Sequence, residues 1–123
     1  MGQHVEVAWL SRIGKRICKD KSLKPKILSR EWFYEFQLPS GRKTKSYLPE
    51  EIQVIHRTRE RMIFQYLEQR ARTRWGELRC LDLGCHEGYF ALQLALRGCR
   101  EVLGIDARKE HVENATLIRI YTI

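Results

Sequence analysis

Residues 80–107 read CLDLGCHEGYFALQLALRGCREVLGIDA and decide the fold class. An apolar run over residues 79–83 predicts a strand that leads into a glycine-containing turn. Apolar residues at helical spacing predict a helix from Gly88 to Arg97, with Gly98 ending it. A second apolar run over 101–105 predicts another strand, which ends at Asp106. A strand, a crossover helix and a second strand make a parallel β–α–β unit, which is half of a nucleotide-cofactor site.

The turn between these elements has the chemistry of a ligand site. Gly84 and Gly88 flank Cys85, His86 and Glu87, and glycines allow both positive φ and close approach of a ligand to the backbone. The helix that follows directs free amides and its positive dipole end to the same place, which favours an anionic group such as a carboxylate. A carboxylate at the end of the next strand, Asp106, is placed to accept ribose hydroxyls.

The acid before the turn distinguishes between cofactors. A dinucleotide site has the pattern G-x-G-x-x-G, whereas this chain has Gly84-x-x-x-Gly88 with His86 between them. Asp82 would repel a pyrophosphate and attract a cofactor that carries an ammonium and a sulfonium. The charges therefore favour S-adenosylmethionine. Simpler roles stay open, because Asp82 could cap a helix or pair with Arg79, and Asp106 could cap the helix after it.

The segment Leu81–Phe90, followed by Val102–Ala107, resembles the first two motifs of class I S-adenosylmethionine-dependent methyltransferases. His86 replaces the central glycine of the usual acid-x-Gly-x-Gly-x-Gly form, as in many members of the superfamily. Residues 32–39 and 48–56 resemble the lead-in region of bacterial relatives, some of which modify the wobble uridine of transfer RNA. The resemblance implies S-adenosyl-L-methionine as cofactor and a set of cofactor-binding positions: Asp82, Gly84, Cys85, His86, Gly88, Asp106 and Ala107. It leaves two roles for His86, contact with the methionine carboxylate or filling the space of a glycine.

The implied fold is α/β, an incomplete Rossmann-like methyltransferase fold that contains only the first βαβ unit. Residues 1–31 are then a basic N-terminal arm, 32–75 a lead-in of hairpin plus helix, and 76–123 the truncated first half of the cofactor-binding domain. The chain alone is expected to lack the catalytic half, so no catalytic residue or methyl acceptor is assigned. Parallel sheets are normally covered on both faces. We therefore expect the hairpin and helix, a second chain or homo-oligomer, or a missing part of the protein to cover this one.

Four further segments outside this unit have predicted structures. Residues 32–47 alternate apolar and polar and predict a β-hairpin that turns at Pro39-Ser40-Gly41, with an aromatic face that packs on the core in preference to stacking on nucleobases. Residues 49–73 predict a long helix that Pro49 begins and Gly76 stops. A short helix is predicted over 5–18, with Lys24-Pro25-Lys26 preventing its continuation. The tail 118–123 alternates and predicts a frayed end or an edge strand.

His56, on the predicted long helix, has two interpretations. It could act as a base or contact a substrate, and a core or boundary histidine is the favoured alternative.

The net charge of the 123-residue chain is +8, which favours polyanionic partners. Possible RNA binding through the basic arm, as a non-enzymatic module or an inactive truncated methyltransferase-like protein, is the alternative function. A second cationic cluster is interleaved with acids and is typical of a solvated helix face. The arm's cations are Arg12, Lys15, Arg16, Lys19, Lys21, Lys24, Lys26 and Arg30; those of the second cluster are Arg57, Arg59, Arg61, Arg70, Arg72 and Arg74.

The cysteines predict neither a metal site nor a disulfide framework. Cys18, Cys80, Cys85 and Cys99 form no Cys-x-x-Cys pair, so no metal is expected. Cys80 and Cys99 are expected to behave as small buried hydrophobes, and a reactive thiolate at Cys85 is the minor alternative. The chain has no apolar run long enough for a transmembrane helix and no signal peptide, so a cytoplasmic location is expected.

Overall fold

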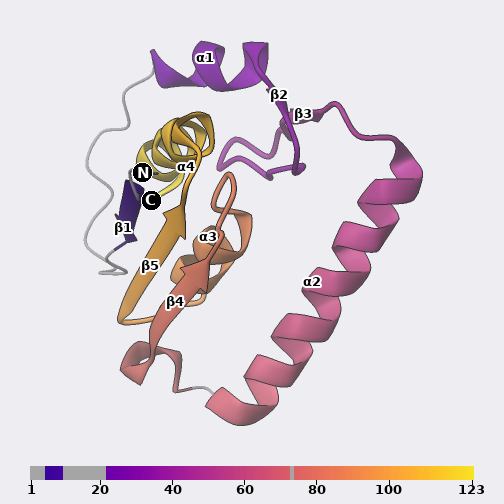
Figure 1. Ribbon diagram of the computed structural model, residues 1–123. Coiled ribbons are helices and arrows are strands. Elements are labelled where there is room, and N and C mark those ends of the chain that lie inside the picture. Colours follow the sequence, from indigo (N-terminus) through magenta and orange to yellow (C-terminus); the bar gives the residue numbers. More distant parts are fainter. Residues whose placement is uncertain (1–4, 10–21, 73) are drawn as a thin grey trace.

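The computed structural model describes residues 5–9, 22–72 and 74–123, which form a mixed α/β structure (Figure 1). The elements in chain order are β1 (Val5–Trp9), α1 (Leu23–Ser29), β2 (Glu31–Trp32), β3 (Lys45–Ser46), α2 (Glu50–Ala71), the 3₁₀ turn η1 (Trp75–Glu77), β4 (Arg79–Leu83), α3 (Tyr89–Leu96), β5 (Glu101–Asp106) and α4 (Lys109–Thr122).

The predicted β–α–β unit is present as β4, α3 and β5. The two strands are parallel neighbours, with Arg79 opposite Glu101 and Leu83 opposite Ile105. Gly104 of β5 allows the turn to lie close to the sheet, since a Cβ added there would lie 3.0 Å from the sulfur of Cys85. Both strands therefore end at the same edge of the sheet, where the turn begins.

A third strand, β1, extends this sheet beside β5. It pairs antiparallel with β5, from Val5 opposite Asp106 to Trp9 opposite Val102, so the strand order is β1-β5-β4. The helix predicted over 5–18 is therefore wrong for residues 5–9, and its remainder lies outside the described residues. The sequence Val-Glu-Val-Ala-Trp is rich in strand-forming residues, and the unpaired edge of β5 supplies its partner.

Helix α2 confirms the predicted long helix and packs on the outside of α3. The rings of Phe64 and Phe90 stack with centroids 6.3 Å apart, and the guanidinium of Arg97 lies 3.7 Å from the Phe64 centroid. The helix ends before Gly76, because Arg72 adopts φ 45° and its N–H closes the last turn on Glu68 O. Gly76 instead lies within η1.

Residues 32–47 confirm the predicted reversal at Pro39-Ser40-Gly41, where Gln37 and Lys43 form an antiparallel bridge, but no regular hairpin ladder extends from it. A turn returns the chain through the bonds Gly41 N–H to Leu38 O and Thr44 N–H to Phe36 O, but β2 and β3 pair in parallel over two residues each. Side chains replace backbone carbonyls as hydrogen-bond acceptors here. The hydroxyl of Thr44 accepts the N–H of Phe36, and the carboxylate of Glu87 accepts the N–H groups of Phe33 and Tyr34. The predicted packing of the aromatic face is confirmed, since these alternating side chains are buried: Trp32, Tyr34, Phe36 and Leu38.

The helices at the two ends of the described chain also differ from expectation. Pro25 lies in the first turn of α1, where a missing N–H costs nothing, so Lys24-Pro25-Lys26 begins a helix and does not break one. The tail continues α4 to Thr122, and Ile118 is fully buried, so the predicted fraying or edge strand is wrong. The largest fully buried side chains come from α1, β2, α3, β5, α4 and two connecting segments: Ile27, Trp32, Leu92, Val102, Ile118, Phe36 and Cys99.

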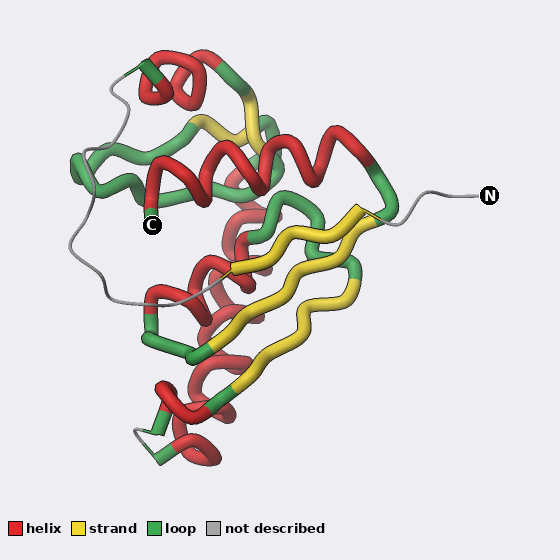
Figure 2. The backbone as a smooth tube through the Cα atoms, turned by 90° about the vertical axis from the view of Figure 1, so that its left-hand side faces the viewer, coloured by secondary structure: helices red, strands yellow, loops and turns green. Residues whose placement is uncertain are grey.

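Among the described residues, none covers one face of the sheet at β4. In Figure 2 the helices lie behind and above the three strands. Leu81 and Leu83 point to the other face and are 57% and 73% exposed. Of the three alternatives, coverage of this face by the hairpin segment and long helix is therefore wrong, because both pack on the side of α3. Within the described residues, no helix is both long and apolar enough to cross a membrane.

Candidate functional site

The turn after β4 has three residues with positive φ: Gly84 at 69°, His86 at 54° and Gly88 at 78°. A left-handed conformation costs a non-glycine residue about 1–2 kcal/mol, so the fold must hold His86 in place. Asp106 does so, because its Oδ2 accepts the backbone N–H of His86 at 2.9 Å. Fewer backbone amides are therefore free to bind a ligand than expected. The N–H of Cys85 also bonds to Ile105 O, and that of Gly88 bonds to Cys85 O.

Asp106 lies at the end of β5, as predicted, and joins the turn to the start of α4. In addition to the His86 bond, its Oδ1 accepts the N–H of Arg108 at 2.9 Å and lies 3.2 Å from His111 Nδ1. Burial alone would raise the pKa of Asp106, but these hydrogen bonds outweigh burial and lower it. Asp106 is therefore an ionised carboxylate whose bond to Arg108 stabilises the turn before α4. The capping alternative is wrong, because Arg108 is the N-cap residue of α4 and no side chain caps that helix.

Asp82 lies on the same face of the sheet, opposite Gly104 of β5. Burial raises the pKa of Asp82, the backbone N–H of Ala91 opposes that shift, and the negative charge of Asp106 raises the pKa further. Its Oδ2 is buried and has no hydrogen-bond partner among the described residues. The pairing with Arg79 is wrong, because Arg79 bonds Glu101 at 2.7 Å. Two carboxylates thus approach one another without a cation bound to Asp82 in the described structure.

Histidine and aromatic rings lie beside Asp106. The rings of His86 and His111 stack with centroids 3.6 Å apart, and Phe33 lies 4.6 Å from His86. Burial, with a smaller contribution from His111, lowers the pKa of His86 to about 4. His86 is therefore neutral near pH 7, and its Nδ1 is buried without a partner among the described residues.

The other predicted positions have simpler surroundings. Cys85 is buried against Gly104, and burial together with the nearby carboxylates raises the pKa of its thiol to about 12, so the thiolate alternative is not supported. Ala107 is exposed after β5. Cys99 is fully buried and Cys80 half-buried, with their sulfurs 3.7 Å apart.

Glu87 is a residue of the turn for which no sequence pattern predicts a role. Its carboxylate is almost fully buried and accepts the backbone N–H groups of Phe33 and Tyr34, at 3.0 and 3.1 Å from Oε1. These contacts fix residues 32–47, here called the lead-in segment, beside the turn. No local pattern marks this role, because the partners lie more than fifty positions away in the chain.

His56 lies on α2 among the aromatic rings of the lead-in segment. Its ring centroid is 5.0 Å from that of Phe33 and 4.7 Å from that of Tyr34, and burial followed by the charge of Arg59 lowers its pKa. The ring is 8% exposed. This packing supports the favoured prediction of a core or boundary histidine.

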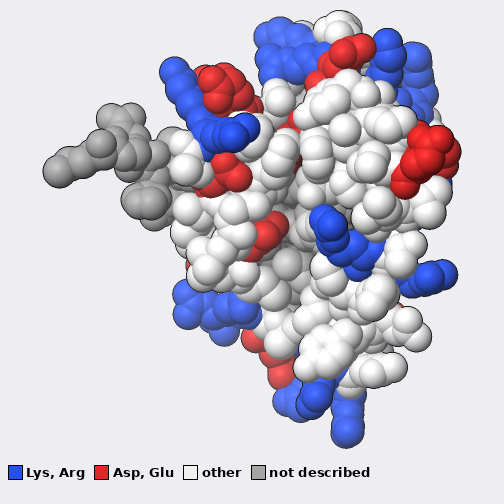
Figure 3. All heavy atoms as spheres, turned by 45° about the vertical axis from the view of Figure 1, so that its right-hand side comes forward, with Lys and Arg blue, Asp and Glu red and all other residues white. Residues whose placement is uncertain are grey.

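The cations of the second basic cluster do not form one continuous surface. Arg57 pairs with Glu50 and Arg74 with Glu77. On the face drawn in Figure 3, lysine and arginine are interspersed with acids and separated by uncharged surface. This distribution supports the solvated-face interpretation. Most of the basic arm lies outside the described residues.

No family model, curated protein or solved structure matches this chain. Within the described residues, no group of three or more histidine, cysteine, aspartate or glutamate side chains is arranged to hold a metal ion.

Proposed function

We propose that the chain is the cofactor-binding part of a class I S-adenosylmethionine-dependent methyltransferase with a Rossmann-like fold. One observation carries the proposal: Asp82 and Asp106 lie at the same edge of two parallel strands, beside a positive-φ turn, and no described cation pairs with Asp82. This is the edge at which open α/β sheets bind ligands.

The electrostatics support a cationic ligand in particular. The charge of Asp106 raises the pKa of Asp82 after burial has already raised it, so the ionised pair is unfavourable without a counter-ion. An ammonium or sulfonium group would supply that counter-ion, and the unpartnered Oδ2 of Asp82 would gain a charge-assisted contact. A pyrophosphate would add more negative charge to the same place.

The residues at the turn have separate roles in the proposed binding. Asp82 supplies negative charge, and Asp106 retains capacity to accept a ribose hydroxyl beside its three present donors. The stacked rings of His86 and His111, of which the His86 ring is neutral, lie beside Asp106 and would shield a bound ligand from water. When bound, the cofactor supplies a methyl group activated by a sulfonium. No described residue is assigned as catalytic, and the methyl acceptor is not assigned either.

Isothermal titration calorimetry with S-adenosylmethionine and S-adenosylhomocysteine tests the proposal. We expect saturable binding to the wild type and its loss in Asp106→Ala. Glu110→Gln is the matched control, because Glu110 is an exposed carboxylate in the first turn of α4 and should leave binding unchanged. Absence of heat and of a thermal shift at millimolar ligand would refute binding by this chain.

The basic arm supports a second candidate, a non-enzymatic RNA-binding module. Eight of the chain's lysines and arginines fall within residues 12–30, which gives this segment a high positive charge density. Binding driven by these cations should weaken steeply with salt and disappear on deletion of residues 1–31. Binding that does not respond to salt, or that survives the deletion, would exclude it.

A further inference from the structure

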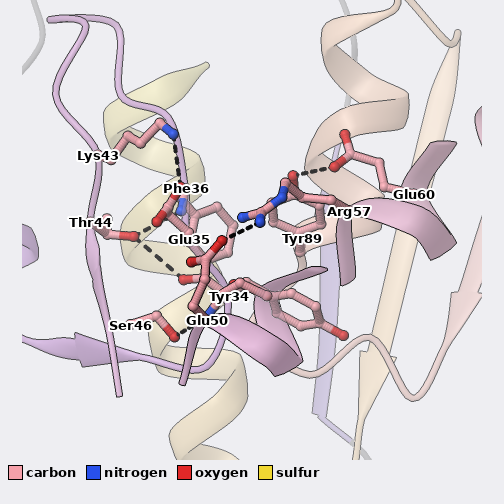
Figure 4. Close-up of polar contacts among 11 residues, drawn as sticks. Tyr34, Glu35, Phe36, Lys43, Thr44, Ser46, Glu50, Arg57, Glu60 and Tyr89 are labelled. Atoms are coloured by element: carbon pink, nitrogen blue, oxygen red, sulfur yellow. Dashed lines mark hydrogen bonds and ion pairs between the residues drawn. The ribbon is translucent and has the colours of Figure 1, made fainter. Parts of the chain in front are cut away.

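A cavity of about 460 Å³ lies between the 34–43 segment, α2 and α3, apart from the glycine turn. Tyr34 and Tyr89, two residues of its wall, stack with ring centroids 4.9 Å apart and an interplanar angle of 18°. Figure 4 shows the two rings with the charged side chains around them. The volume of the cavity is in the range of small-molecule sites, and its lining combines aromatic and hydrogen-bonding groups as such sites do.

The two cations that line the cavity are already paired. Lys43 contacts the carboxylate of Glu35 at 2.9 Å, and Arg57 pairs with Glu50 (Figure 4). Both cationic side chains are more than half exposed, at 61% and 53%, so they lie at the outer rim. The lining therefore presents no uncompensated positive charge to a ligand.

Glu60 is different, because its carboxylate has a neutral partner. Its Oε2 accepts the hydroxyl of Tyr89 at 2.6 Å, and no cation of the described structure lies within ion-pair distance of it. Burial raises the pKa of Tyr89, and the hydrogen bond and charge of Glu60, followed by the charge of Glu35, raise it further, while the charge of Arg97 opposes them to a smaller extent. The end of the cavity at Tyr89 is therefore electronegative.

We propose that this cavity binds a small organic ammonium ion, whose charge contacts Glu60 and whose apolar body lies against Tyr34 and Tyr89. An ammonium gains a charge-assisted hydrogen bond from the carboxylate and a favourable interaction with aromatic faces. The site needs no cofactor at the glycine turn, so the test of this proposal is independent of the test of the proposed function.

Side-chain amides of three glutamines that line the cavity, Gln37, Gln53 and Gln93, report occupancy by ¹H–¹⁵N NMR. The probe is phenethylammonium, with 2-phenylethanol as its neutral counterpart and phenylacetate as its anionic one. We expect the amine to shift these amides with a dissociation constant on the order of millimolar, and both counterparts to bind at least about tenfold more weakly. Equal binding of the alcohol, tighter binding of the acid, or shifts confined to other residues would overturn the proposal.

Two variants and a control identify the anchor. Glu60→Gln should weaken the amine about tenfold. Glu51→Gln, an exposed acid in the first turn of the same helix, should leave it unchanged. Tyr89→Phe retains the ring and releases the carboxylate of Glu60, so it should bind the amine at least as tightly as the wild type. This second variant keeps the test decisive if Glu60→Gln fails to fold. A Tyr89→Phe protein with native chemical shifts that loses the amine would contradict the assignment of Glu60 as anchor.

Discussion

The glycine turn after β4 and the lead-in segment at 32–47 lie side by side, yet they are held by different kinds of contact. Bonds to strand β5, a short distance along the chain, hold the turn: Cys85 N–H to Ile105 O and His86 N–H to Asp106. A side chain distant in the sequence holds the start of the lead-in segment, because Glu87 accepts the N–H groups of Phe33 and Tyr34. The difference shows that one residue, Glu87, belongs to the first region and positions the second.

Removing that carboxylate should have the largest effect. Glu87→Ala leaves two buried backbone N–H groups without acceptors, which should lower the free energy of unfolding by about 2–4 kcal/mol. Glu87→Gln retains an oxygen at Oε1, which accepts both groups, and should cost less than half as much. Urea denaturation measures both variants. Equal losses in the two would show that charge, not the hydrogen bonds, fixes the lead-in segment.

The same substitution, glycine to alanine, can be made in both the turn and the lead-in segment. Gly84 and Gly41 have φ of 69° and 82°, and a Cβ at either position meets nothing within 4 Å. Alanine at each should therefore cost only the backbone term, about 1–2 kcal/mol. The prediction, checked by urea denaturation, is that both losses agree to within about 0.5 kcal/mol. A much larger loss at one position would show steric or ligand-site constraints that the geometry does not contain.

A smaller effect concerns pH and belongs to the turn alone. The pKa of His86 falls from 6.5 to about 4 on folding, so the unfolded chain binds the proton more readily. Stability due to neutral His86 is then fully present above pH 6.5 and is lost as pH falls toward 4. Asp82 and Glu87 have raised pKa values and act in the opposite direction.

The difference between the wild type and His86→Asn isolates this contribution, because asparagine tolerates positive φ. The wild type should lose stability relative to the variant between pH 6.5 and 4, as measured by denaturation at each pH. Parallel profiles would contradict a buried neutral His86.

Features that depend on neighbouring residues could be predicted from the sequence, and features that depend on distant contacts could not. Local signals located α2, β4, α3 and β5, because apolar periodicity and glycines act within a few residues. The shared edge of Asp82 and Asp106 followed from the parallel unit. Strand β1 was missed because its pairing depends on a distant edge of β5. Pro25 was misjudged because the same residue that breaks a helix can also lie in its first turn.

The like-charged pair of Asp82 and Asp106 beside the turn is the central claim, and Asp82→Asn tests it most directly when stability and binding are measured on the same protein. Loss of a buried, like-charged carboxylate should leave the free energy of unfolding at neutral pH unchanged or higher, because the raised pKa of Asp82 marks a cost of keeping it ionised. The same change should weaken S-adenosylmethionine about tenfold or more, since the counter-charge is gone. A variant that is clearly less stable and binds S-adenosylmethionine as the wild type does would contradict the account.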